Sequence, residues 1–427
     1  LLEKKGEEGS VIVGSTVNVK GGTVAGEIYG GSYVRNTAAT SKVDNTTVNI
    51  SGGTIGATEP QGWAQYVVGG GKAMSNATTT ESSVMSTAAV NISGGDITRG
   101  AVVGGGFARA QGASGSATAN VKDSVVNLTG GSLVGVVGGG LAENLGTVDS
   151  SATATAGVTT ASLTIGGDVT VNGIIYKGND GVEQPSPAAV IGGGLAYSKN
   201  GSKATASKAT ASVETANTII NGGTINGNVF AGGMADGTSA TANADGTSAT
   251  ANVGTANLTI NGGIINGDVY AGGYALDNGT ANVANANVTL KGGSINGKVT
   301  VGNATNATIT LDGTGAKVTG DDTGDFEGNK SSTLAFNNYN GTFENVAIGF
   351  GTLAVAENSN VYVDALVSGQ RGSDRPNTGI FGAPTPTDEG TLNPTGSGFT
   401  ITGGGTITAK EFHVNPDASV MIEHGNV

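Results

Sequence analysis

One six-residue motif recurs along most of the chain and restricts the folds that are open to it. The motif alternates apolar and polar residues and ends in Gly-Gly, as in Val17–Gly22, Val90–Gly95 and Leu258–Gly263. Alternation with period two places the apolar side chains on one face of a strand. The two glycines allow positive φ at a corner. The motif therefore predicts short strands that end at tight turns.

A second glycine motif follows the first in most units. It consists of two apolar or aromatic residues and a glycine cluster, as in Val137–Gly140 and Phe230–Gly233. No single unit has enough apolar residues to fold alone, but stacked units bury a continuous thin core. Unit lengths vary because of Ala/Thr/Ser/Asn tracts and of inserts near 56–65 and 173–189. Three aromatic residues share one repeat position and are expected to stack in the core or at a corner: Tyr29, Phe230 and Tyr270.

These motifs predict an all-β fold, a right-handed parallel β-helix (β-solenoid) built from variable-length repeats punctuated by Gly-Gly. The regular repeats span 10–316, after a charged N-terminal segment or expression remnant at 1–9. Residues 317–427 are expected to continue the solenoid less regularly, with a Pro/Gly-rich loop at 368–398, because proline cannot donate to a strand ladder. Eight to twelve coils spaced about 4.8 Å apart would give a rod of roughly 40–60 Å. Without a recognisable capping sequence, we expect further chain or a partner at the ends.

The composition narrows the class of protein. Charged residues make up 12% of the chain, aromatic residues 4%, and the net charge is −13. An acidic chain without basic patches is not expected to bind nucleic acid. The absence of cysteine excludes disulfides and cysteine-based metal sites, and fits a protein that is exported unfolded. No apolar run is long enough for a transmembrane helix.

The residues available for chemistry favour a protein that is not an enzyme. The only histidines are His413 and His424, so no Ser-His-Asp set can be assembled from the repeats. The alternative is a carbohydrate-active β-helix enzyme, a polysaccharide lyase or glycosidase, which needs acidic or basic residues gathered on one face. A third hypothesis is ice binding through threonine arrays. The varying offsets of the threonine tracts argue against a flat array.

Three aromatic residues in or beside the inserts are weak candidates for ligand binding: Trp63, Tyr66 and Tyr176. Loops on a rigid scaffold often carry function, and an aromatic ring there can stack on a sugar or contact a protein. The alternative for Trp63 is that it folds back over the rod.

One acidic cluster lies in a turn-rich run and is a weak candidate calcium site. Its members are Asp321, Asp322, Asp325 and Glu327. Alternating oxygen atoms in a loop can hold Ca²⁺, although a solvated loop is the simpler interpretation. We expect no other cofactor.

The pattern resembles bacterial autotransporter passenger domains and related secreted adhesins. The resemblance is carried by the repeated Val-x-Ile-x-Gly-Gly units, the absence of cysteine, the acidic Gly/Asn/Thr/Ser composition, and Gly351–Val355 followed by Asn358–Val361. The resemblance is one of composition and repeat pattern and covers about residues 10–427. No site motif of the family matches, so no site residues are carried over. The resemblance implies a right-handed β-helix, display on the bacterial cell surface, and adhesion or self-association.

We therefore expect an extracellular structural or adhesive protein. It would act as a rigid β-solenoid stalk or as the subunit of a self-assembling filament. Its expected partners are itself, end to end or laterally, and glycans or proteins of host or neighbouring cells.

Overall fold

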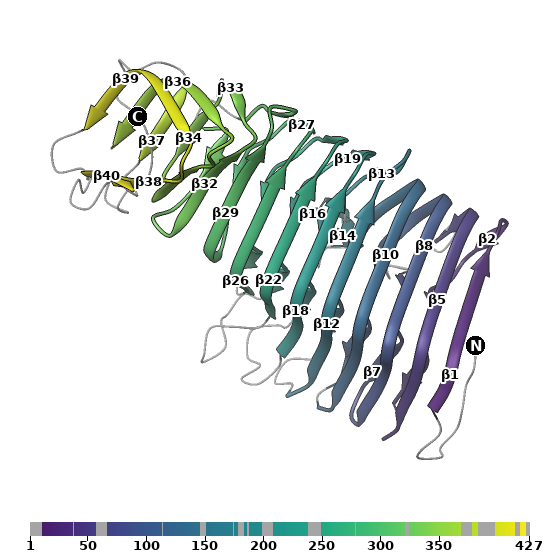
Figure 1. Ribbon diagram of the computed structural model, residues 1–427. Helices are drawn as coiled ribbons and strands as arrows, with labels where there is room; N and C mark the ends of the chain where they lie inside the picture. Colours follow the sequence, from purple (N-terminus) through teal and green to yellow (C-terminus); the bar gives the residue numbers. More distant parts are fainter. Residues whose placement is uncertain are drawn as a thin grey trace.

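The computed structural model describes residues 11–36, 38–56, 66–112, 114–145, 151–173, 175–177, 183–185, 188–198, 208–237, 249–277, 279–320, 324–368, 378–382, 398–414 and 419–423. Every regular element in these ranges is a β-strand. In this part of the chain there is accordingly no helix that could span a membrane. The strands stack into an elongated rod with the two termini at opposite ends (Figure 1).

A ribbon of parallel strands, here called the long ribbon, runs the length of the rod (Figure 1). Each strand pairs in parallel with its counterpart in the next coil, for example Val17 with Val48. Twelve such steps of about 4.8 Å give a rod roughly 58 Å long. In order of pairing, the strands are β1 (Val11–Val19), β5 (Thr40–Ile55), β8 (Thr79–Val103), β10 (Ser116–Val137), β12 (Thr153–Ile165), β18 (Lys208–Ile220), β22 (Ala249–Ile260), β26 (Gly279–Leu290), β29 (Ala304–Asp312), β32 (Ser332–Asn337), β35 (Thr352–Val355), β38 (Gly398–Thr402) and β40 (Ser419–Glu423).

Two further ribbons of shorter strands complete each coil, and β5, β8 and β10 run on past their corners into them. The corner ribbon contains β2 (Thr23–Val24), β13 (Thr170–Val171), β19 (Thr224–Ile225), β23 (Ile264–Ile265), β27 (Gly293–Ile295) and β30 (Ala316–Val318). The back ribbon contains β3 (Ile28–Tyr29), β6 (Val67–Val68), β16 (Ala188–Ile191), β20 (Asn228–Phe230), β24 (Val269–Tyr270), β28 (Val299–Thr300), β31 (Phe326–Glu327), β34 (Val346–Ile348) and β37 (Gly379–Gly382).

A separate seven-stranded parallel sheet forms a second arm on the first seven coils. Its strands follow the second glycine cluster of each coil. They are β4 (Tyr33–Arg35), β7 (Lys72–Ser75), β9 (Phe107–Ala110), β11 (Leu141–Asn144), β17 (Leu195–Ser198), β21 (Met234–Gly237) and β25 (Tyr274–Asp277). The arm ends at β25, whereas the other ribbons continue.

The remaining strands lie in the less regular C-terminal coils and in one insert. β33 (Asn340–Thr342), β36 (Asn360–Ser368) and β39 (Thr406–Val414) pair in parallel with one another. β14 (Ile175–Lys177) and β15 (Glu183–Pro185) form an antiparallel hairpin within the second insert. The all-β stack of parallel strands therefore agrees with the predicted solenoid architecture.

The two glycine motifs are required for different physical reasons. The first motif turns a corner with positive φ, as at Gly131, where φ is 98°. The second motif is required for space. A Cβ placed on Gly139 would lie 2.6 Å from Val213 Cγ2 and 2.8 Å from the Gly193 carbonyl oxygen. The second cluster therefore marks a close approach between neighbouring coils.

Columns of identical or similar side chains build the core. In the corner ribbon, for example, Ile55, Ile97 and Leu133 occupy one fully buried column. Between the long ribbon and the seven-stranded sheet, the core consists of alanine, as at Ala117 and Ala142. Most threonines alternate with the alanines and lie on the outer face, but Thr80 pairs with Ala117 and is fully buried in this core.

The alternation of inward and outward side chains changes parity within the long strands. In β10, Val121 and Ser124 are both buried, and Lys122 and Asp123 between them point outward. The pairing register skips at the same place in neighbouring coils. Two consecutive outward residues are the signature of a bulge, which bends the strand.

Candidate binding surfaces

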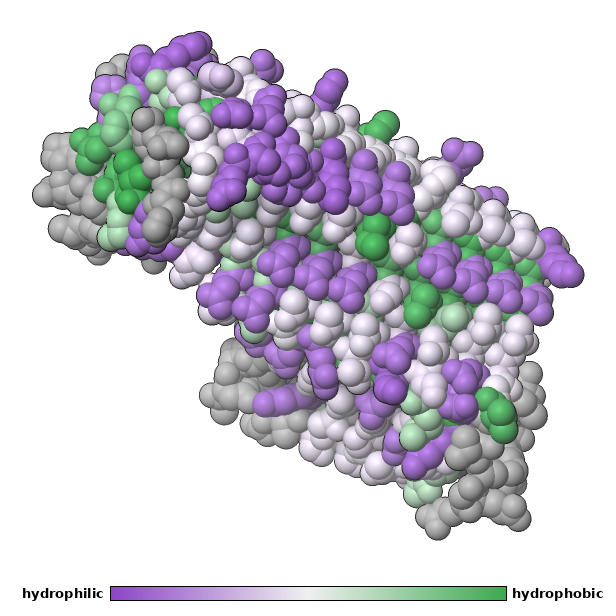
Figure 2. Space-filling view, viewed as in Figure 1, coloured by the Kyte–Doolittle hydropathy of each residue, from purple (hydrophilic) through white to green (hydrophobic). Residues whose placement is uncertain are grey.

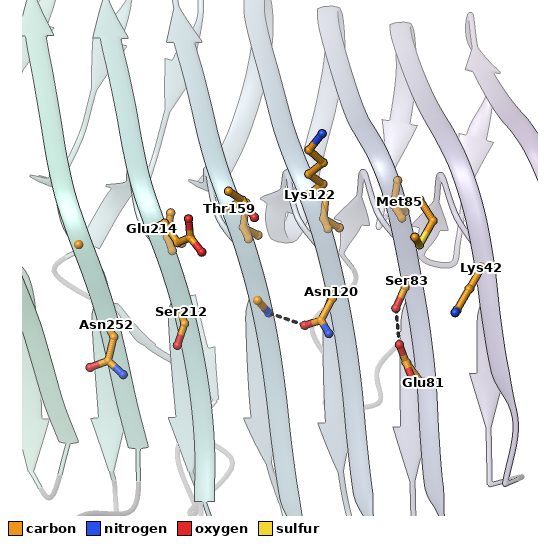
Figure 3. A pocket seen from close by; sticks show the side chains of 16 residues that line it. Lys42, Glu81, Ser83, Met85, Asn120, Lys122, Thr159, Ser212, Glu214 and Asn252 are labelled. Carbon is orange, nitrogen blue, oxygen red and sulfur yellow. Dashed lines mark hydrogen bonds between the residues drawn. The ribbon is translucent and has the colours of Figure 1, made fainter.

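The bulges of successive coils align and form a shallow groove on the outer face of the long ribbon. Its volume is about 820 Å³, and it crosses the strands from β5 to β22 (Figure 3). The valine column at the bulge forms its floor, and polar side chains form its rims. The floor residues are Val84, Val121, Val158 and Val213, and the charged residues at the rims are Lys42, Glu81, Lys122 and Glu214.

The charges in this groove are too far apart for two-carboxylate catalysis. Glu81 lies on β8 and Glu214 on β18, three coils away, which alone corresponds to about 14 Å, and Glu214 is also displaced along the strand direction, since Glu81 is in register with Thr210. Glycosidases hold their two carboxyl groups roughly 5–9.5 Å apart. Glu81 also accepts a hydrogen bond from the Ser83 hydroxyl at 2.6 Å (Figure 3). The groove offers an elongated contact surface, with both signs of charge spread along its length.

A buried ionic cluster lies on the face of the seven-stranded sheet opposite the alanine core, beside the apolar cluster that contains Tyr66 and Phe107. Arg109 and Glu143 occupy equivalent positions in β9 and β11 and form an ion pair of 2.5 Å. The Arg109 Nε atom donates a second hydrogen bond to Glu143 at 2.7 Å, and the Tyr66 hydroxyl donates to the other carboxylate oxygen at 2.8 Å. All three residues are at least 92% buried. Both carboxylate oxygens of Glu143 are thus satisfied inside the protein.

Lys72 extends the cluster toward the N-terminal end of the rod. Its ammonium group contacts Glu27 at 2.7 Å and lies 4.6 Å from the centroid of the Phe107 ring. Burial lowers the pKa of Lys72 despite the neighbouring carboxylate of Glu27. For Arg109, burial acts to lower the pKa, but the attractions of Glu143, Tyr66 and Glu27 together with the hydrogen bond to Glu143 outweigh it and raise the pKa. The charged groups of the cluster are paired with one another and covered by aromatic rings. The cluster therefore links neighbouring coils inside the protein.

The predicted aromatic ligand site is only partly within the described residues. Trp63 lies outside them, and for Tyr176 only the backbone, paired with Gln184 in the hairpin, is described. Tyr66 is 8% exposed and packs edge-on against Phe107 at 4.9 Å. The ring packs on Phe107 and the hydroxyl is bonded to Glu143, so Tyr66 has no exposed ring face on which a ligand could stack.

The candidate calcium site is also only partly described, because Asp321 and Asp322 fall outside the described ranges. Both carboxylate oxygens of Asp325 accept backbone hydrogen bonds, from Gly320 at 2.7 Å and from Val346 at 2.8 Å. Glu327 pairs with Lys298 at 2.9 Å. These contacts give the two carboxylates structural roles in holding the coil. Among described residues, no group of three or more metal-ligating side chains is found.

Rows of asparagine run along the outer faces of the rod. Each side-chain amide donates to the carbonyl oxygen of the asparagine in the preceding coil, at 2.9 Å from Asn49 to Asn18 and at 2.9 Å from Asn91 to Asn49. Other rows contain Asn217, Asn257 and Asn287, and Asn172, Asn226, Asn266 and Asn296. Figure 2 shows hydrophilic side chains gathered in such rows along the rod.

Threonine also forms a row, contrary to the offsets read from the sequence. Pairing aligns Thr118, Thr155, Thr210, Thr250 and Thr280 in five successive coils. The tracts differ in length, but the extra residues lie between coils and leave the register unchanged. Two residues further along the strand, the side chains are mixed, for example Asn120, Gly157 and Ser212. A paired Thr-x-Thr array does not arise there.

Sequence reasoning missed the ionic cluster, although a signal for it was present. Phe107-Ala-Arg109 and Leu141-Ala-Glu143 each follow a Gly-Gly-Gly run at the same offset. Opposite charges at one repeat position in adjacent coils are expected to pair. That comparison required knowing that the residues after the second glycine cluster form a strand.

The strand register and the repeated motifs define an all-β stack of parallel strands with the architecture of a β-solenoid. No family model, curated protein or solved structure matches the chain. Its surfaces must therefore be interpreted from their own geometry. They comprise a shallow groove, regular amide rows and a closed ionic cluster.

Proposed function

We propose that the chain is an extracellular adhesive scaffold of the bacterial cell surface, a rigid β-solenoid that acts as a stalk or joins into filaments. The observation that carries this proposal is the coil-to-coil pairing of the long ribbon, which sets asparagine and threonine side chains in regular rows over several successive coils. The right-handed sense of the coil and the autotransporter-like character belong to the same proposal.

The asparagine rows supply the adhesive chemistry in this proposal. Along a row, each amide uses one donor and one acceptor for its neighbours, as Asn49 does with Asn18 and Asn91. An amide has two donor hydrogens and two acceptor lone pairs, so each rung keeps capacity for a partner. Spacing of about 4.8 Å repeats that capacity along the rod. Another regular surface, such as a second copy of the chain or a glycan, would meet many such groups at once.

The spacing of charges supports a scaffold over the alternative of a carbohydrate-active enzyme. The two groove carboxylates, Glu81 and Glu214, lie three coils apart and are therefore separated by at least about 14 Å. The ion pair between Arg109 and Glu143 is buried inside the protein. Binding along the groove or the rows requires neither a general acid nor a general base.

The proposal is tested by electron microscopy over a concentration series, together with adhesion of beads that carry the purified chain. We expect single rods at low concentration, and either filaments or bead clusters as the density increases. Asn91→Asp, which places a negative charge within a row, is the matched variant and should weaken clustering. Rods that stay dispersed and bind neither cells, glycans nor one another, or turnover of a polysaccharide, would refute the scaffold role.

A further inference from the structure

The seven-stranded sheet stops partway along the rod and leaves a step. The back ribbon continues past this point, since Tyr270 of β24 pairs with Thr300 of β28. The chain then passes directly from β28 to β29 without forming a strand of the second arm. A Cβ on Gly272 would lie only 2.5 Å from the Ala304 nitrogen, so the next coil crosses immediately over the corner glycine. Strand β25 therefore lies at the edge of the sheet, beside continuing coils.

The backbone of β25 presents hydrogen-bonding groups at this edge. The Tyr274 N–H donates to the Gly233 carbonyl at 3.0 Å, which points it toward β21. Backbone groups of successive residues alternate in direction along a strand, so the N–H and C=O of Ala275 point away from β21. Among the strands that the structure describes, β25 is the last in this sheet. An edge of this kind is a template for another strand.

The side chains beside the edge form a partly exposed apolar shelf. Met234 and Ala235 of β21 are fully buried, whereas Tyr274, Ala275 and Leu276 of β25 are partly exposed. The Tyr274 ring lies 5.1 Å from Phe230 and 5.7 Å from Tyr270. The shelf is thus a continuation of the buried core of the second arm, and it lacks the strand that covers that core elsewhere.

We propose that the edge of β25 binds an extended peptide strand of a partner polypeptide, which adds in parallel as the next strand of the seven-stranded sheet. Backbone hydrogen bonds supply affinity in this mode of recognition, and alternate side chains supply specificity. This inference goes beyond the scaffold role and does not rest on it.

The existing columns of the sheet specify the sequence that fits. The first position of each strand is mostly apolar, as in Leu141, Leu195 and Met234. The second position faces the alanine core and is alanine from β7 to β25, so only a small residue fits. The third position lies beside Leu276. The bound strand should therefore read apolar, small, apolar.

A peptide is favoured over a sugar because the edge offers backbone donors and acceptors in strand register. A sugar stacked on Tyr274 would leave the Ala275 peptide groups to water. The chain itself contains a segment with the required pattern, Gly193–Ser198, which reads Gly-Gly-Leu-Ala-Tyr-Ser. This segment is a suitable probe.

The test measures fluorescence anisotropy of the labelled Gly-Gly-Leu-Ala-Tyr-Ser peptide with the full chain. We expect saturable binding that weakens about tenfold or more when alternate peptide amides are N-methylated, because two backbone hydrogen bonds are lost. Exchange of the peptide alanine for leucine should have a similar effect. Ala275→Pro removes the outward N–H of the edge and should also abolish binding, but residue 275 packs against the alanine core, so the N-methylated peptide is the test that leaves the sheet itself unchanged.

Arg35→Pro at the opposite edge strand, β4, is the matched control and should bind normally. Absence of saturable binding, or equal binding of the N-methylated peptide, would overturn the proposal without affecting the scaffold role. Binding lost only in Arg35→Pro would place the site at the other edge and also overturn it. Binding of a neutral oligosaccharide that Tyr274→Ser removes, with no peptide binding, would assign the shelf to glycans instead.

Discussion

Thr218 is the one polar residue in an otherwise apolar column of the core, and its replacement by valine should stabilise the protein. It pairs with Leu163 in the preceding coil and with Leu258 in the next. The side chain is 1% exposed, and its hydroxyl has no hydrogen-bond partner. Valine has nearly the same shape and places a methyl group where the hydroxyl lies.

The expected gain follows from the cost of the isolated hydroxyl. Burying such a group without a hydrogen bond costs about 1–3 kcal/mol in mutational data. Thr218→Val should therefore raise the free energy of unfolding by about 1–3 kcal/mol. Denaturant unfolding measures this as a higher midpoint at an unchanged m-value. The unchanged slope matters because a long stack can lose cooperativity in unfolding.

Thr259→Val is the matched control for this prediction. Thr259 lies one coil away, and its side chain is on the outer face of β22. The same chemical change there should alter stability by less than about 0.5 kcal/mol. A Thr218→Val protein that is no more stable than the unsubstituted chain would refute the reasoning, because it would show that the buried hydroxyl has no net cost.

Three further predictions concern the ionic cluster, the second glycine motif and acid sensitivity. Arg109→Met should cost about 3–5 kcal/mol in denaturant unfolding by leaving Glu143 buried and unpaired, and the double variant with Glu143→Leu should recover most of that loss. An Arg109→Met protein that is as stable as the unsubstituted chain would contradict the importance of this ion pair. Gly139→Ala should destabilise by about 1–3 kcal/mol through overpacking, whereas Gly166→Ala, where the nearest atom to a Cβ is 3.6 Å away, should have little effect on the thermal midpoint. Hydrogen bonds from Asn338 and Lys291 lower the pKa of Asp312, so its stabilisation is present above the unfolded-state pKa and is lost as the pH falls through the folded-state pKa. Asp312→Asn should flatten that part of the acid unfolding curve, and an unchanged curve would show that this carboxylate is not linked to folding.

The strands and corners of the long ribbon could be predicted because local sequence determines them. Alternation and Gly-Gly fix which side chains face inward, and Gly131 takes the positive φ that its motif indicates. Thr218 and Ile219 show the limit of this approach. The hydrophobic pattern alone does not decide between them, but pairing with Leu163 places Thr218 inside and leaves Ile219 39% exposed. Register, which is set between coils, overrides the local preference there.

The seven-stranded sheet could not be predicted from any single unit. Segments such as Leu141–Asn144 are four residues long and mix apolar, small and charged residues, which resembles a loop. They are buried on both faces only because neighbouring coils and the back ribbon enclose them. The burial of Tyr66 could not be predicted for the same reason. Its place beside an insert suggested exposure, but its contacts with Phe107 and Glu143 come from other coils.

The end of the second arm at β25 also has a mechanical consequence. The resistance of a rod to bending grows steeply with its thickness, so the two-armed portion up to β25 is stiffer than the single-armed portion that follows. A transverse load on the molecule would concentrate its curvature just past the step, where β28 and β29 carry the rod without the second sheet. Under such a load the rod should bend just after β25, and the strand edge proposed to bind a partner lies beside that position.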